Sequence, residues 1–130
     1  MKRFLLDTHV VIWALTNDRR LNRATREILQ NEHCSVSAIS LWEMLSKHDR
    51  KRLALPEGRL VESIERTGAH LISLKPEHAE EGLGLHALHA DPFDRMLVGT
   101  ARVERMILLT RDAELLELAA PLLGPLLQEV

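Results

Sequence analysis

Four acidic residues, each next to an apolar run, are spread along this chain of 130 residues: Asp7, Glu43, Asp94 and Asp112. Asp7 ends the strand-like stretch FLLD, and Asp112 ends a second one, ILLTRD. Glu43 and Asp94 lie near the starts of two amphipathic segments. In an α/β sheet, the carboxyl ends of strands and the starts of the following helices meet along one edge, where ligands bind. Four carboxylates at that edge predict a site for a divalent cation.

Each acid alone also fits a structural role. Glu43 lies three residues after Ser40, as in a capping box, and Asp94 lies in the first helical turn after Pro92. Asp112 suits an N-cap, and the first acid could end its strand in an Asx-turn. Four caps that converge on one edge without a cation would repel one another. The conjunction therefore favours the metal site.

The chemistry that needs such a site is phosphodiester hydrolysis. Hard oxygen ligands suit Mg²⁺ or Mn²⁺, which bind through one or two carboxylates and keep several waters. The ion lowers the pKa of a bound water and neutralises charge on the phosphate, so no nucleophilic side chain is required. The sequence has no G-x-S-x-G elbow, no Walker loop and no G-x-G-x-x-G, which argues against other chemistries.

Length and composition predict one domain over residues 1–130. The net charge of −2 gives no global nucleic-acid signal, although a local basic patch or a bound metal can supply the attraction. Cys34 is the single cysteine, so an internal disulfide is impossible and a reducing cytoplasm is expected. No apolar stretch approaches the ~20 residues of a membrane span, so no membrane is expected.

Short apolar runs alternate with helical segments of about ten residues, which favours a parallel sheet covered on both faces. The predicted strands are 3–6, 34–37, 69–73 and 107–109, with a short last strand in the tail PLLQEV. The predicted helices are 22–31, 38–48, 59–67, a short one from Pro76 to Gly82 or Gly84, 92–104, and 112–119. Residues 8–16 can start a helix at Thr8, but their Val and Ile content also favours a strand.

Four segments resemble the PIN-domain ribonucleases, in particular the toxin subunit of VapBC-type toxin–antitoxin pairs. They are LLDTHVVIWAL (5–15), SAISLWEMLSK (37–47), HADPFDRMLVGTA (89–101) and LLTRDAEL (108–115), and they follow the family's order. The resemblance implies a three-layer α/β/α fold with a parallel sheet of about five strands. It also implies a Mg²⁺- or Mn²⁺-dependent endoribonuclease with an RNA substrate, a small cognate antitoxin as partner, and a homodimer.

The resemblance also assigns roles to residues. By the family's pattern Asp7, Glu43 and Asp94 match the three core acids, and Asp112 matches a fourth, more variable one. Asp91 is expected to be an accessory ligand or a loop cap. Three further residues have auxiliary roles: Thr8 and Thr110 are placed to hydrogen-bond the acids or a metal-bound water, and Arg95 to brace Asp94 or contact a scissile phosphate. Gly99 stands where many relatives carry alanine, which predicts a slight loss of local stability in mid-helix.

Two tryptophans and two basic clusters remain open to two interpretations. Trp13 and Trp42 lie on apolar stripes of their helices, which favours core or an antitoxin-binding groove over base stacking. The basic clusters are either solvated helix surface or tracks for RNA phosphates. Their members are Lys47, His48, Arg50, Lys51 and Arg52 in one, and Arg19, Arg20, Arg23 and Arg26 in the other. A weaker alternative is a zinc site formed by His78, His86, His89 and Asp91.

Three rival functions make different demands on the sequence. A receiver-like metal-binding module needs an acceptor Asp at the end of the third strand and a late Lys, but residues 69–73 end in Ser73 and no Lys follows Lys75. A phosphatase of the haloacid dehalogenase type needs Asp-x-Asp-x-Thr, where this chain has Asp-Thr-His-Val-Val from Asp7. A catalytically inactive PIN fold that serves as an interaction module is the third.

Overall fold

The computed structural model describes residues 2–50, 55, 58–85 and 91–130. A five-stranded sheet of order β3-β2-β1-β4-β5, in which every pairing is parallel, forms the centre of the fold. The strands are β1 (Arg3–Leu6), β2 (His33–Ser37), β3 (His70–Ile72), β4 (Ile107–Thr110) and β5 (Leu127–Glu129). The helices are α1 (Thr8–Thr16), α2 (Arg23–Asn31), α3 (Ala38–Asp49), α4 (Leu60–Arg66), α5 (Pro76–Leu83), α6 (Pro92–Glu104) and α7 (Ala113–Leu123). A 3₁₀ turn, η1 (Gly124–Leu126), precedes β5.

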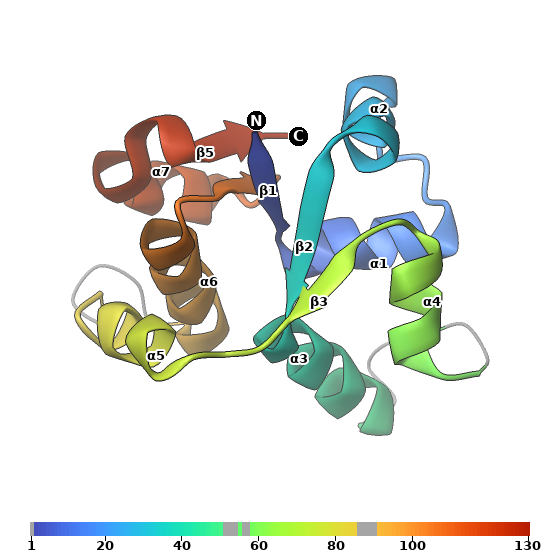
Figure 1. The fold of residues 1–130 in the computed structure, drawn as a ribbon, viewed down its shortest axis with the longest axis horizontal. Coiled ribbons are helices and arrows are strands. Elements are labelled where there is room, and N and C mark those ends of the chain that lie inside the picture. The colour runs from blue at the N-terminus through green and yellow to red at the C-terminus, as the bar shows by residue number, and fades with distance from the viewer. Residues whose placement is uncertain (1, 51–54, 56–57, 86–90) are drawn as a thin grey trace.

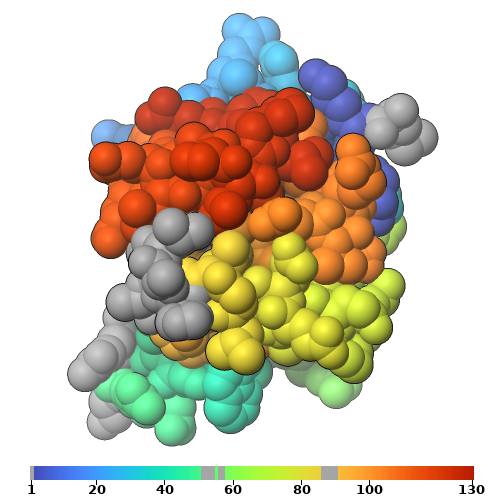
Figure 2. Space-filling view, turned by 90° about the vertical axis from the view of Figure 1, so that its left-hand side faces the viewer, coloured from blue at the N-terminus to red at the C-terminus, as the bar shows by residue number. Residues whose placement is uncertain are grey.

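Helices cover both faces of the sheet, as the alternation of the sequence predicts (Figure 1). In β1, Phe4 and Leu6 face one apolar cluster, together with residues of α1 such as Val10. Leu5 points to the opposite face and packs in a second cluster with Leu97 of α6 and other residues of α6 and α7. This period of two is the side-chain alternation of a strand buried on both sides. Figure 2 shows the second layer, with α7 (red) above α5 (yellow).

The strand order reverses between β1 and β4. The chain runs outward from β1 to β2 and β3, and then returns to the other side of β1 to form β4 and β5. Such a reversal opens a crevice at the carboxyl ends of the two strands, and ligands bind there. Asp7 follows β1 directly, and Thr110 is the last residue of β4. The observed order differs from the 2-1-3-4-5 order of receiver domains, which removes the receiver-like alternative.

Most predicted elements are confirmed. Two segments, residues 8–16 and the end of α7, were ambiguous or wrong in the sequence. Residues 8–16 are helical despite their β-branched content, because the Asp7 side chain accepts a hydrogen bond from the Thr8 N–H at the start of α1. Helix α7 ends at Leu123 and not near 119, so that prediction was wrong. Pro121 lies in the last turn, where its ring removes a single hydrogen bond close to the helix end. No helix in the described ranges is long and apolar enough to cross a membrane.

The backbones of α5 and α6 touch at two glycines. A Cβ built on Gly99 of α6 lies 2.7 Å from the His78 carbonyl oxygen and 2.8 Å from the Gly82 nitrogen. A Cβ on Gly82 lies 3.0 Å from the carbonyl oxygen of Arg95. The missing side chain of Gly99 lets the two helices approach, a packing role that the sequence did not predict. That contact fixes α6, whose first turn carries Asp94.

We expect Gly99→Ala to lower the free energy of unfolding by about 1–2 kcal/mol. Alanine gains up to ~1 kcal/mol of helix propensity, but a methyl group forced against backbone atoms costs roughly 1–3 kcal/mol. Gly84→Ala is the matched control, because its Cβ meets nothing closer than 3.5 Å and its φ is −63°. Urea denaturation of both variants checks the sign, and a Gly99→Ala protein as stable as the parent contradicts the packing argument.

Candidate active site

Asp7 lies at the centre of the site, at the switch between β1 and β4. Its side chain is buried, and the residue is only 3% exposed. Its Oδ1 accepts a hydrogen bond from the Thr8 backbone N–H at 2.7 Å, and its Oδ2 accepts one from the Thr110 hydroxyl at 2.6 Å. Its own N–H donates to the carbonyl oxygen of Leu109. The carboxylate is thus fixed by one contact from α1 and one from β4.

Burial raises the pKa of the Asp7 carboxyl above its ordinary value of 3.8, and the nearby Glu43 charge raises it further. The hydrogen bond from Thr110, the charge of His9 and the hydrogen bond from Thr8 all lower the same pKa. Desolvation is the largest of these effects and decides the direction. An ionised Asp7 is therefore costly in this protein, and a cation beside it would remove that cost.

Thr110 connects Asp7 to Asp112. The Thr110 hydroxyl donates to Asp7 and accepts a hydrogen bond from the Asp112 N–H at 3.1 Å. Asp112 itself is exposed and caps α7, with its Oδ1 accepting from the Leu115 N–H at 3.0 Å. One Asp112 oxygen is therefore occupied by the cap, and the Thr110 hydroxyl is bonded to Asp7.

Glu43 reaches the site from α3 and is 7% exposed. Its Oε2 accepts a hydrogen bond from the Lys47 ammonium one turn later, at 2.8 Å. The capping-box interpretation was wrong, since the N-cap of α3 is Ser37. Ser40 instead accepts a hydrogen bond from the Thr8 hydroxyl at 2.9 Å, which joins α3 to α1. Thr8 therefore positions the helix that carries Glu43, and its hydroxyl donates to Ser40 and not to an acid.

Sequence reasoning missed the partners of both Thr8 and Glu43. The Glu43–Lys47 spacing of four residues was a usable signal, because Glu followed by Lys at that distance pairs on a helix surface. The Thr8–Ser40 hydrogen bond links residues 32 apart in the chain. No local sequence pattern predicts a contact between residues so far apart in the chain.

Asp91 and Asp94 open α6. Asp91 is its N-cap, with Oδ1 accepting from the Phe93 N–H at 2.8 Å and from the Asp94 N–H at 3.3 Å. This geometry supports the loop-cap interpretation of Asp91. Asp94 is half-buried in the first turn, after Pro92. In the described part of the chain, no three acidic, histidine or cysteine side chains lie close enough together to form a complete metal site by themselves.

Arg95 and the two tryptophans lie in three different surroundings. Arg95 lines a small apolar pocket with Leu115 and other α7 residues, and its Nε is buried without a hydrogen-bond partner. Trp13 is buried at 6% exposure, as expected for core. Trp42 is 62% exposed, which excludes the core and leaves an antitoxin-binding groove or base stacking as its interpretations.

Of the histidines considered for a zinc site, the structure describes His78. His78 is buried, accepts a hydrogen bond at Nδ1 from the Lys75 N–H and contacts Glu104 through Nε2. That bonding satisfies both ring nitrogens without a metal, while the predicted partners His86 and His89 lie outside the described residues. Lys51 and Arg52 of the first basic cluster also lie outside them. Burial raises the pKa of the Cys34 thiol to about 11, which makes it a poor nucleophile.

Comparison with known proteins finds two nucleases that are similar to this chain over most of its length. The chain is 28% identical over 121 residues to "Ribonuclease VapC22" of Mycobacterium tuberculosis, covering 88% of this chain and 91% of the relative. It is 26% identical over 122 residues to "tRNA(fMet)-specific endonuclease VapC" of Shigella flexneri, covering 86% and 88%.

Solved structures share the fold. DNA-bound VapBC from Salmonella typhimurium matches with a TM-score of 0.65 and 19% identity, over 99% of this chain and 98% of that one. VapBC2 from Rickettsia felis, bound to a DNA fragment from its promoter, matches with a TM-score of 0.62 and 15% identity, over 97% of each chain. The family model of the PIN domain matches residues 4–121. The protein therefore belongs to the PIN-domain family, with the VapC ribonucleases among its relatives.

Proposed function

We propose that this protein is a divalent-metal-dependent endoribonuclease that hydrolyses RNA phosphodiester bonds, and that it is the toxin of a toxin–antitoxin pair. The observation that carries the proposal is the buried Asp7 carboxylate at the β1–β4 switch, close enough to Glu43 for the two charges to interact. Two buried acids at the ligand-binding edge of a sheet favour a site completed by a cation. The names of both curated relatives describe nucleases, which supports the reaction class.

The donor set fits Mg²⁺ or Mn²⁺. Carboxylate oxygens are the ligands these ions prefer, and such ions often use one or two protein carboxylates together with water and substrate phosphate. Asp7 and Glu43 would hold the ion, with Asp94 at the start of α6. Asp112 would act from the rim, either directly or through water. A bound ion would supply charge neutralisation at the phosphate and a water activated for attack.

The protein's own part is to hold the acids in place. Thr110 fixes the orientation of Asp7 through a 2.6 Å hydrogen bond. Lys47 holds one oxygen of Glu43 at 2.8 Å, which fixes the orientation of that carboxylate. Such supporting contacts orient ligands and keep the site close to the geometry that the reaction needs.

We further propose a small antitoxin protein as partner, a homodimer in solution and the cytoplasm as compartment. The first is supported by the structural relatives, whose titles describe toxin–antitoxin and VapBC assemblies. The last is supported by the single buried cysteine, which forms no internal disulfide. Sedimentation velocity of the purified chain measures the oligomeric state directly.

We expect the purified protein to cleave RNA with Mg²⁺ or Mn²⁺ and not with EDTA. Asp7→Asn should reduce cleavage by roughly 10²–10³-fold, the range found when one electrostatic stabilising group is lost. Glu65→Gln is the matched control, an exposed acid on α4 that should cleave like the parent. Gel analysis of an end-labelled RNA panel gives the rates. Asp7→Asn that cleaves as fast as Glu65→Gln would show that the mechanism is wrong, and an inactive parent would favour the scaffold alternative.

Asp7→Asn should leave the protein as stable as the parent or more stable at neutral pH. The pKa of Asp7 is raised by folding, so its ionised form destabilises the fold above that pKa. The cost disappears as the pH falls through the folded pKa toward 3.8. Denaturation midpoints measured without divalent ions at neutral and acidic pH check the sign. A variant that is less stable than the parent at neutral pH would contradict it.

Thr110→Val should lower cleavage by about 10- to 100-fold, because outer contacts of metal ligands have effects of that size. Thr110→Ser keeps the hydroxyl and should recover most of the rate. The effect should be larger at low Mg²⁺ concentration, since a misoriented Asp7 binds the ion more weakly. Metal titrations of cleavage by the three proteins measure this. Equal losses in Thr110→Val and Thr110→Ser would contradict the role of the hydroxyl, because serine keeps it.

A further inference from the structure

Lys47 places a cation of the chain itself in direct contact with one of the two buried acids. Its Nζ lies 2.8 Å from Oε2 of Glu43, one helical turn earlier on α3. The charge of Glu43 in turn raises the pKa of Asp7, so the two carboxylates share one electrostatic environment. Any divalent cation that these acids attract therefore meets a positive charge that is already present.

The two members of this ion pair differ in their exposure to solvent. The Lys47 side chain is 40% exposed, whereas the Glu43 side chain is 9% exposed. An exposed ammonium is stabilised little by an ion pair, because water replaces the partner when the pair separates. A buried carboxylate that loses its partner keeps an uncompensated charge, which strongly destabilises the fold. Lys47 is therefore the member that can leave, provided that another cation takes its place at Glu43.

The ion pair lies in the wall of a cavity that has room for such an exchange. Glu43 and Lys47 line a space of about 580 Å³ between α3 and the start of α6, where Asp91 and Phe93 form the opposite wall. A water molecule takes up about 30 Å³ in the liquid. A divalent cation with several waters and a displaced ammonium therefore both fit in this space.

The balance of charge favours exchange of the two cations over simple addition. The ionised carboxylates of Asp7 and Glu43 and the ammonium of Lys47 together leave one net negative charge. A divalent cation added to this set would leave one net positive charge, whereas its exchange for the ammonium would leave none. Repulsion between an ammonium and a divalent cation a few ångströms apart is strong at the permittivity of a protein surface.

Lys47 also orients Glu43, and removal of its charge and of its orienting contact affect metal binding in opposite directions. Loss of an orienting contact weakens metal binding by about 10- to 100-fold. Loss of a positive charge strengthens it, since two unit charges 4 Å apart change an equilibrium by about a thousandfold at an effective permittivity near 20, and a divalent cation doubles the energy. Solvent at the half-exposed lysine screens part of this repulsion. The charge effect still exceeds the orienting effect.

We propose that Lys47 is an internal counter-ion that competes with the divalent cation for Glu43 and thereby sets the metal affinity of the protein. Its ammonium neutralises the buried carboxylate when no divalent cation is bound and moves into the cavity when one binds. This inference rests on the proposed metal-dependent function and adds a regulation of the same site. Lys47 thus stabilises the metal-free protein and lowers its affinity for metal.

The test is calorimetric titration of the full chain with Mn²⁺, a measurement that does not depend on RNA cleavage. Lys47→Met removes the charge and keeps an unbranched side chain, and it should bind Mn²⁺ about tenfold or more tightly than the parent. Lys47→Arg keeps the charge and should bind Mn²⁺ like the parent. If Lys47→Met fails to fold, Lys47→Gln replaces it with the same expected direction, because glutamine keeps a neutral donor for Glu43.

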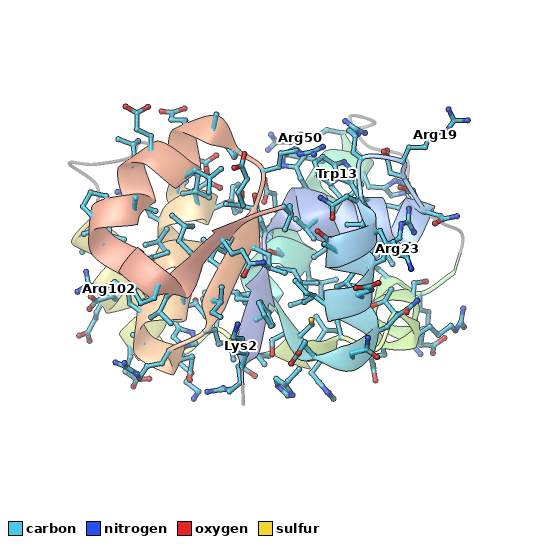
Figure 3. The ribbon with its side chains drawn as sticks, turned by 90° about the horizontal axis from the view of Figure 1, so that it is seen from above. Lys2, Trp13, Arg19, Arg23, Arg50 and Arg102 are labelled. Carbon is cyan, nitrogen blue, oxygen red and sulfur yellow. The ribbon has the colours of Figure 1, made fainter. Side chains whose placement is uncertain are left out.

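Lys75→Met is the matched control. Lys75 Nζ lies 2.8 Å from Oε1 of Glu104, the same distance as in the Lys47 pair. The Glu104 carbonyl oxygen accepts a hydrogen bond from Arg3, the neighbour of Lys2. Figure 3 shows Lys2 at the opposite end of the molecule from Arg50, which lines the cavity beside Glu43. The control pair therefore lies far from the acids, and its loss should leave Mn²⁺ affinity unchanged.

Stability without metal gives a second measurement. In EDTA, Lys47→Met should be less stable than the parent, because the buried Glu43 carboxylate is left unpaired. Added Mn²⁺ should raise the denaturation midpoint of this variant more than that of the parent, since tighter binding stabilises the folded state more. In a Glu43→Gln background, Lys47→Met should cost much less stability, because the lysine has lost its charged partner. Equal losses in both backgrounds would assign Lys47 a packing role and overturn the proposal.

The outcomes separate this inference from the proposed function. Mn²⁺ affinity in Lys47→Met equal to or weaker than that in Lys75→Met overturns the counter-ion, while metal-dependent RNA cleavage by the parent leaves the ribonuclease in place. Tighter Mn²⁺ binding in Lys47→Met without RNA cleavage by the parent supports the counter-ion and overturns the ribonuclease. A lack of Mn²⁺ binding in the parent and in every variant overturns the metal-dependent function and this inference with it.

Discussion

The site depends on keeping one carboxylate, Asp7, out of water at the end of the central strand. Its two oxygens are held by a backbone N–H of α1 and by the Thr110 hydroxyl of β4. The second contact exists only because β4 returns beside β1, which the strand order β3-β2-β1-β4-β5 achieves. The strand order of the sheet therefore also determines how the Asp7 carboxylate is oriented.

The desolvation cost of the two buried carboxylates, Asp7 and Glu43, is offset in different ways. Glu43 has the Lys47 ammonium at 2.8 Å, whereas Asp7 receives only neutral hydrogen bonds from Thr8 and Thr110. Hydrogen bonds from neutral donors offset part of a desolvation cost but not all of it, and the pKa of Asp7 stays above its ordinary value. The part of the desolvation cost that is not offset lies at Asp7, at the switch between β1 and β4. A cation would be most strongly attracted there.

Sequence alone predicts the elements well where local chemistry specifies them. Pro92 at the first turn of α6 places that helix at residues 92–104, as predicted. Residues 8–16 stayed open between helix and strand in the sequence, and the Asp7 cap decides for the helix α1. The acids could be assigned to one edge because strand ends meet there. The Thr8–Ser40 bond and the α5–α6 contact at Gly99 could not be predicted, because both join segments that only the tertiary fold brings together.

Helix α3 shows most clearly why the orientation of some side chains could not be predicted from the sequence. Its apolar residues at 39, 42 and 45 predict an inward stripe, yet Ser40, Glu43 and Met44 are the buried ones, and Trp42 and Leu45 are exposed. The helix is thus turned by about one residue from the orientation that apolar burial favours, and departures of this kind concentrate at functional sites. The turn brings Glu43 toward Asp7 and leaves Trp42 beside the acids. A single rotation of α3 therefore accounts for both the buried acid and the exposed ring.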